Sequence, residues 1–82
     1  MLQRQLIKGF ILENFLFSND DNAIGDQDSL ISGGIIDSTG IHELIMFLEE
    51  RFNLAVSPAE MTPANFDSIT TVDAFVTHKL AG

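Results

Sequence analysis

Residues 33–41 read Gly-Gly-Ile-Ile-Asp-Ser-Thr-Gly-Ile, and a run with regularly spaced apolar residues follows them as far as Phe52. The paired glycines predict a loop, because glycine adopts turn conformations that other residues avoid. Asp37 and Ser38 are both suited to the N-cap of a helix, since either side chain can accept a hydrogen bond from the free amides of the first turn. We therefore expect a helix from about Ser38 to Phe52. Its apolar stripe is Ile41, Leu44, Ile45, Leu48 and Phe52.

The segment before this loop predicts another amphipathic helix. Residues 2–16 carry apolar side chains at helical intervals, and Gly9 weakens the pattern in its middle. The apolar positions are Leu2, Leu6, Ile7, Phe10, Ile11 and Leu16. Residues 18–34 are rich in turn-forming residues and show no periodicity, which predicts a long loop. We expect Leu30 and Ile31 to hold this loop on the core.

Two short helical signals follow Phe52. Ser57 and Glu60 match a capping box, in which each residue's side chain satisfies a backbone amide of the other, with Pro58 at the first helical position. Thr62-Pro63 repeats this kind of start, and Phe66 is the expected core anchor of these turns.

The last helix is predicted from the residues after a turn at Asp67-Ser68. Thr70 is the expected N-cap, and the apolar face is Val72, Phe75, Val76 and Leu80. Together the elements predict an all-α fold, a small bundle of three main helices plus a short minor helix, with a long loop after the first helix. With no repeat and no linker, residues 1–82 are predicted to be a single domain.

The chain is strongly acidic. Its 12 Asp and Glu residues against 4 Lys and Arg residues give a formal net charge of −8. Such a surface repels phosphate groups, so we expect neither nucleic acid nor a membrane as partner, and instead proteins with basic patches. No segment resembles a signal peptide or spans a bilayer. These features predict a cytoplasmic monomer.

No metal site is expected. The chain has no cysteine, so thiolate ligands are excluded. The acidic loop that starts at Asp20 fails as an EF-hand, because Ile24 and Ile31 would occupy two of its ligand positions. His42 and His78 have no further ligand at suitable spacing on a shared helix face.

Ser38 is the candidate for chemistry. As a nucleophile it would need a base and an orienting acid; His42 lies one helical turn further, but a small helical bundle leaves little room for a substrate pocket, so we expect no enzyme. Two other roles fit Ser38: it serves only as a helix cap, or it carries a phosphate group, which the amides and dipole at a helix N-terminus favour. The residues alone leave these two roles open.

The sequence around Ser38 resembles the acyl carrier protein family. The run from Gly34 to Phe52, with the Asp-Ser pair followed by Glu-Leu-Ile and Leu-Glu-Glu, is similar to the signature region of that family. Residues 56–60 and 66–72 are similar to the family in the same order and at the expected distances. The resemblance therefore covers essentially the whole chain, and it implies the helical fold expected above.

The resemblance also implies a non-catalytic carrier. Ser38 would accept 4′-phosphopantetheine from coenzyme A through a phosphopantetheinyl transferase, with Asp37 in a supporting role. The thiol of this arm would hold an acyl or aminoacyl group as a thioester, which suits a chain without cysteine. An acyl- or aminoacyl-activating ligase would load it, and an acyltransferase or synthase of a specialised lipid, polyketide or related biosynthetic pathway would receive it.

The helix after Ser38 would dock on these partners. The resemblance assigns this role to exposed residues of that helix: His42, Glu43, Met46, Glu49 and Glu50. Thr39 replaces the Leu or Met that usually follows the serine in the family, and Gly40 replaces the acidic residue that often comes next in fatty-acid carriers. These departures favour a specialised carrier over one of fatty-acid synthesis. The alternative is an unmodified acidic interaction or regulatory module, which would not need the Ser38 hydroxyl.

Overall fold

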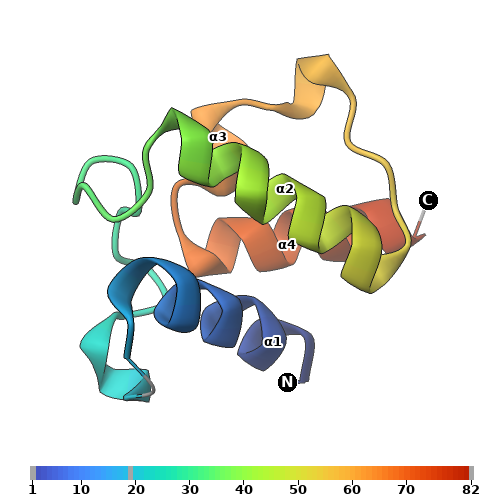
Figure 1. Cartoon of the computed structure of the whole chain (residues 1–82). Coiled ribbons are helices and arrows are strands. Elements are labelled where there is room, and N and C mark those ends of the chain that lie inside the picture. The colour runs from blue at the N-terminus through green and yellow to red at the C-terminus, as the bar shows by residue number, and fades with distance from the viewer. Residues whose placement is uncertain (1, 19, 82) are drawn as a thin grey trace.

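The computed structural model describes residues 2–18 and 20–81. They form four α-helices, α1 (Leu2–Ile11), α2 (Ser38–Phe52), α3 (Pro63–Phe66) and α4 (Ile69–Ala81) (Figure 1). Between them lie the π-helical turn η1 (Leu12–Leu16) and the 3₁₀ turns η2 (Asp21–Ala23) and η3 (Pro58–Glu60). These residues contain no strand, and none of their helices is long and apolar enough to cross a membrane. The predicted all-α fold, with three main helices, one short helix and a long first loop, is confirmed.

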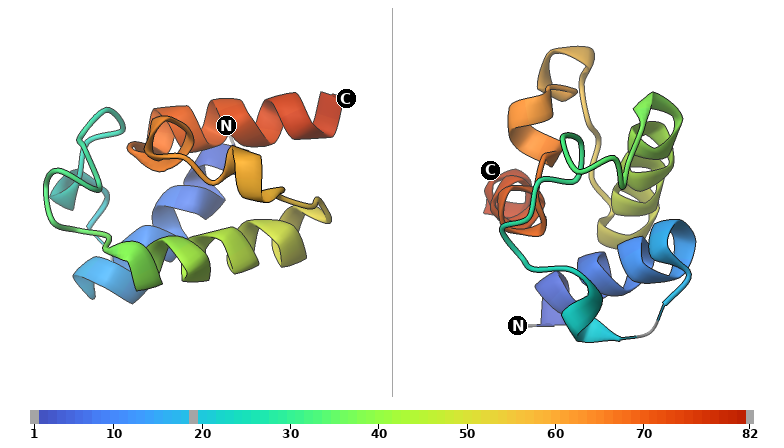
Figure 2. Two further views of the ribbon diagram at one scale, coloured as in Figure 1. Left: turned by 90° about the horizontal axis from the view of Figure 1, so that it is seen from above. Right: turned by 90° about the vertical axis from the view of Figure 1, so that its left-hand side faces the viewer.

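The three long helices surround one apolar core. Figure 2 shows α2 and α4 running in the same general direction, with α1 running the opposite way and the long loop wrapping one end. Phe66 is fully buried beneath α4, which confirms it as the anchor of the short helix. The core is formed by Ile7, Ile11, Leu12, Ile24, Leu30, Ile36, Leu44, Ile45, Leu48, Val56, Phe66, Ile69, Val72, Phe75 and Val76.

The first helix departs from the prediction at its C-terminal end. It is α-helical only as far as Ile11, and η1 then ends at Phe17, a left-handed residue with φ 52°. The wider π turn brings Leu12 into the core and leaves Phe17 86% exposed. Packing of Leu12, and not the helical period, therefore sets this end. Of the predicted stripe, Ile7 and Ile11 are buried and Leu6, Phe10 and Leu16 half-buried, while Leu2 lies outside the described side chains.

The last helix begins earlier than predicted. Ser68, not Thr70, caps α4: its hydroxyl accepts from the Thr71 N–H at 3.1 Å, and its own N–H donates to Thr71 Oγ1 at 3.0 Å. Thr70 instead donates its hydroxyl to the backbone carbonyl of Asp26 in the long loop. Leu80 was expected on the apolar face but is 53% exposed, because the last turn of α4 borders an open cavity.

Polar contacts hold the end of the long loop. Leu30 is fully buried, as predicted, whereas Ile31 is half-buried. The Asp67 carboxylate accepts from the Ser29 hydroxyl at 2.6 Å and from the Ile31 N–H at 3.2 Å. Asp67, which precedes α4, therefore fixes the segment immediately before the glycines.

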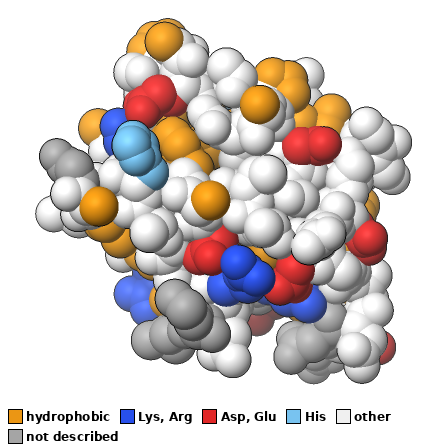
Figure 3. Space-filling model, turned by 180° about the vertical axis from the view of Figure 1, so that it is seen from behind, with side chains coloured by type: hydrophobic (Ala, Val, Ile, Leu, Met, Phe, Trp, Pro, Cys, Tyr) orange, Lys and Arg blue, Asp and Glu red, His pale blue; other side chains and the backbone are white. Residues whose placement is uncertain are grey.

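Ion pairs join the middle of the loop to two helices. Arg4 and Lys8 of α1 bind Asp26 at 3.3 and 3.1 Å, and Arg4 also binds Asp73 of α4 at 3.0 Å. In Figure 3 a basic group lies between two acidic groups on the face seen from behind. The hydrogen bond from Lys8, aided by Arg4, holds the pKa of Asp26 below its ordinary value.

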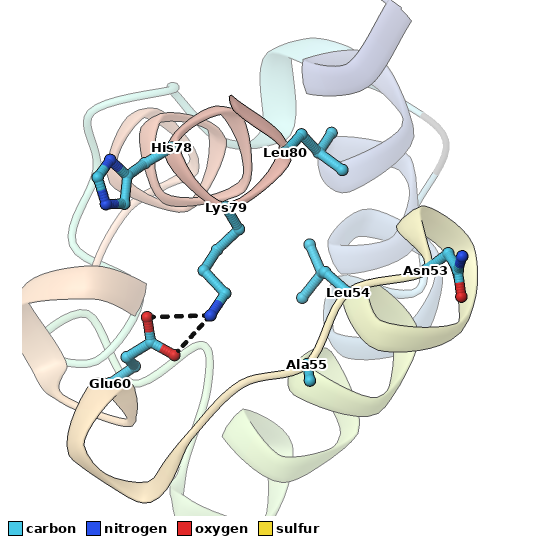
Figure 4. Close-up of a pocket in the computed structure, with 7 residues that line it drawn as sticks. All are labelled: Asn53, Leu54, Ala55, Glu60, His78, Lys79 and Leu80. Carbon is cyan, nitrogen blue, oxygen red and sulfur yellow. Dashed lines mark hydrogen bonds and ion pairs between the residues drawn. The ribbon is translucent and has the colours of Figure 1, made fainter. Parts of the chain in front are cut away.

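The connector between α2 and α3 is fixed at two points. Glu49 accepts from the Val56 N–H at 3.0 Å, and Glu60 accepts from the Ser57 N–H at 3.0 Å, which is one half of the predicted capping box. Lys79 of α4 also binds Glu60 at 2.9 Å, reaching it across the edge of a cavity of about 560 Å³ (Figure 4).

Candidate functional site

The N-terminus of α2 presents the candidate serine. Asp37 is the N-cap, and its carboxylate accepts from the Gly40 N–H at 2.8 Å. Ser38 is the first helical residue, and its side chain is exposed. The sequence suggested two alternative N-cap residues, and the structure shows that Asp37 is the N-cap. The hydroxyl of Ser38 is not needed to start the helix.

The preceding loop explains why Ser38 lies at the surface. The N–H groups of Ile35 and Ile36 both donate to the Leu30 carbonyl at 3.0 Å, which closes the glycine turn. A side chain at Gly33 would place its Cβ 2.5 Å from a backbone oxygen, and Gly34 has φ +74°, so both positions require glycine. Because Ile36 is buried, the next two residues emerge from the core at the start of α2.

The body of α2 matches the prediction closely. It runs from Ser38 to Phe52, the predicted bounds. Three residues of its predicted stripe, Leu44, Ile45 and Leu48, are buried, and Ile41 and Phe52 are half-buried against the core. This packing fixes which side chains of α2 remain available at the surface.

One side of α2 forms an open cavity with the first residue of α3 and the two residues before it. The cavity has a volume of about 220 Å³ and contains Ser38 and His42 in its lining. The remaining lining residues are Ile41, Ile45, Met61, Thr62 and Pro63. Residues 61–63 were not expected at this site, since no local sequence signal shows that the start of α3 and the residues before it fold back toward Ser38.

Another side of α2 forms a groove with α1. Glu43, Met46 and Glu50 line it, and Met46 is 59% exposed. Phe10, Asn14 and Phe47 complete this α1–α2 groove, whose volume is about 300 Å³. The rings of Phe10 and Phe47 stack with their centroids 4.2 Å apart and form its apolar base. Neither phenylalanine was expected at the site, although Phe47 adjoins Met46 in sequence.

The five predicted docking residues thus divide into three settings. Glu43, Met46 and Glu50 share the α1–α2 groove, whereas His42 lies in the cavity with Ser38. Glu49 is half-buried and hydrogen-bonded to the connector. Among the described residues no group of three His, Asp or Glu side chains could hold a metal ion.

Known proteins similar to this chain are carriers. The D-alanyl carrier protein of Streptococcus pyogenes serotype M5 (strain Manfredo) is 34% identical over 68 residues, which cover 80% of this chain and 85% of that protein. The protein of the same name from Streptococcus pyogenes serotype M49 (strain NZ131) gives the same values. That from Streptococcus suis (strain 98HAH33) is 44% identical over 45 residues, 55% of this chain and 56% of the relative.

No protein-family model matches the chain. The relatives nevertheless cover most of its length, and the chain combines an all-helical fold with an Asp-Ser pair at the start of its longest helix. It is therefore a carrier protein and belongs to the acyl carrier protein family.

Proposed function

We propose that this carrier bears 4′-phosphopantetheine on Ser38 and holds its cargo as a thioester on that arm. The main support is the exposed hydroxyl of Ser38, which lies at the start of α2 while Asp37 alone caps the helix. The alternative, an unmodified interaction module, would not need an exposed serine at this position.

The site fits a phosphodiester. The first turn of α2 contains no acidic residue, and the free amides and positive dipole end of a helix favour a negative group. The adjoining cavity, with Ile41, Ile45 and Met61 in its wall, gives the apolar part of an arm a surface to lie on. When bound, the arm supplies the thiol that a cysteine-free chain lacks.

We propose an aminoacyl cargo, with D-alanine as the first to be tested. The named relatives are D-alanyl carrier proteins. A small aminoacyl group also suits a shallow cavity of about 220 Å³, whereas a long acyl chain would have to open a core whose side chains are fully packed. An aminoacyl cargo implies a narrower kind of pathway than the specialised lipid, polyketide or related pathways that the sequence suggested.

The partners follow from this chemistry. A phosphopantetheinyl transferase would attach the arm, with Asp37 supporting it at the modified serine. An aminoacyl-activating ligase would load the thiol, and an acyltransferase or synthase would take the cargo. We propose that residues 1–82 act as one non-catalytic, monomeric carrier domain in the cytoplasm.

We also propose that these partners dock on α2. Glu43 and Glu50 lie on either side of the exposed Met46 in the α1–α2 groove, so a basic patch with an apolar residue at its centre would complement them. Glu49 and His42 lie next to this surface, although the Glu49 carboxylate already accepts a hydrogen bond from the connector.

Intact-mass measurement tests the attachment. Incubation with coenzyme A and a broad-specificity transferase should add the mass of one phosphopantetheine to the wild-type chain and none to Ser38→Ala. Thr39→Ala removes the neighbouring hydroxyl and should leave the gain unchanged. An unmodified wild-type chain, or a gain that survives Ser38→Ala, would contradict the proposal and favour the unmodified module.

A further inference from the structure

We propose that the side chain of His42 binds the phosphodiester that joins the arm to Ser38. This inference rests on the proposed function. It assigns His42 to positioning the arm, in place of the docking role that the sequence suggested. The arm would then leave α2 along the cavity shared with Met61, which adjoins the α1–α2 groove.

The positions of the two residues allow the contact. Ser38 and His42 are one turn apart on α2, and residues at this spacing are neighbours on one helix face. Both are exposed, and both line the same cavity of about 220 Å³. A phosphate bonded to the Ser38 oxygen would therefore lie at the mouth of the cavity beside the imidazole.

The charged groups around the cavity favour His42 as the side chain that binds the phosphodiester. Apart from Ser38 and His42, the residues that line the cavity come from α2, from the start of α3 and from the two residues before it. None of them carries an ionisable group: Ile41, Ile45, Met61, Thr62 and Pro63. Arg4, Lys8 and Lys79 are engaged in ion pairs elsewhere. Arg51 lies near the other end of α2, about 20 Å from Ser38 along the helix axis at about 1.5 Å per residue.

The nearby carboxylates have other contacts. Asp37 binds the Gly40 N–H, Glu60 binds Lys79, and Glu43 lines the α1–α2 groove. Within residues 2–18 and 20–81, no ion pair involves His42. In a chain of net charge −8, an exposed histidine next to the modified serine is thus free to meet a phosphate.

Phosphorus NMR of the loaded protein tests the contact. A phosphodiester keeps its single charge from about pH 5 to 8, the range in which histidine titrates. The phosphorus resonance of the wild-type holo-protein should therefore shift with pH along a single histidine titration curve. The shift should vanish in His42→Gln and persist in His78→Gln, which changes the other histidine, on α4.

A second measurement needs no variant. Attachment of the arm should change the ring resonances of His42 and leave those of His78 in place. A phosphorus resonance that is flat with pH, or a pH-dependent shift that persists in His42→Gln, would overturn the contact. The attachment of the arm is checked first by intact mass. A protein that takes up the arm but shows no histidine-linked shift contradicts only this inference. A protein that cannot take up the arm contradicts the proposed function as well.

Discussion

Gly40 shows how a single residue couples the start of α2 to the end of the first helical segment. It is buried, and a Cβ built on it would lie 2.8 Å from Phe15 Cε1 and 3.1 Å from Ile36 Cγ2. The ring of Phe15 therefore packs directly on the backbone next to Ser38. The acidic residue that often stands here in fatty-acid carriers would collide with these side chains, so the glycine at this position has a steric reason.

We predict that Gly40→Glu destabilises the protein. A glutamate in the first turn gains roughly 0.3–1 kcal/mol from the helix dipole, but displacing Phe15 and Ile36 costs about 1–3 kcal/mol by overpacking. The packing cost is larger, so the free energy of unfolding should fall by roughly 1–2 kcal/mol. For a chain of this size that lowers Tm by about 4–16 °C, measurable by thermal denaturation.

Gly9 provides the matched control at the residue scale. It lies inside α1, and a Cβ built there meets nothing within 4 Å. Gly9→Ala should therefore raise the free energy of unfolding by about 0.5–1 kcal/mol, the usual gain in a helix interior. A stable Gly40→Glu variant beside a stabilised Gly9→Ala would show that Phe15 does not restrict the position.

At the scale of elements, the proposed attachment site and the proposed docking surface lie on different sides of α2. Its cavity side holds Ser38 and His42, whereas its groove side holds Glu43, Met46 and Glu50. A partner can therefore bind the groove while the arm lies along the adjoining side of the helix. The two functions should respond to different substitutions.

We predict that Glu43→Gln with Glu50→Gln slows transfer by partner enzymes. Removing two charges that flank the docking surface weakens electrostatic steering, so kcat/KM should fall on the order of tenfold and become less sensitive to salt. Helix content by circular dichroism should remain near that of the wild type. Glu49 is left unchanged, because its carboxylate binds the Val56 N–H.

The matched control carries the same change of net charge at other exposed positions. Gln27→Lys with Ala74→Lys also raises the net charge by two units, through one added lysine in the loop and one in α4. This variant should keep most of its kcat/KM. Equal losses in the two double variants would mean that net charge, and not the groove, governs docking.

Elements with local signals could be predicted from the sequence. The bounds of α2 were correct because Asp37 starts the helix through its own side chain and the apolar stripe continues to Phe52. Ser38 became the candidate because it stands at this predicted helix start, within a run that resembles the acyl carrier protein family. The end of α1 was missed because the π turn depends on burying Leu12, and the start of α4 because Ser68 and Thr71 bind each other there.

The cavity beside Ser38 could not be predicted, because it is formed by contacts distant in sequence. Met61 and Pro63 reach the site only because the connector is tied to α2 through Glu49 and to α4 through Glu60. No residue near Ser38 encodes these contacts. The same holds for Phe15 over Gly40, which requires the π turn.

At the scale of the whole molecule, the few basic residues hold an acidic chain together. Of 4 Lys and Arg residues, Arg4, Lys8 and Lys79 each bind a carboxylate from another element. The first two join the long loop to α1, and the third joins α4 to the turn before α3. Because the loop ends at Ser38 and the connector lines its cavity, these ion pairs support both walls of the candidate site.

We predict that the stabilisation from Glu60 disappears in acid. The Ser57 N–H, followed by Lys79, lowers the pKa of Glu60 from 4.5 to about 2. Since folding favours the carboxylate, its stabilisation is complete above pH 4.5 and is lost as the pH falls toward 2.

Acid also relieves the repulsion of a chain with net charge −8. The Tm of the wild type alone therefore reports both the loss of the Glu60 contacts and the loss of this repulsion. The difference in Tm between wild type and Glu60→Gln isolates the first: it should be largest near neutral pH and shrink between pH 4.5 and 2. A difference that stays constant over this range would show that the charge of Glu60 does not hold the connector on α4.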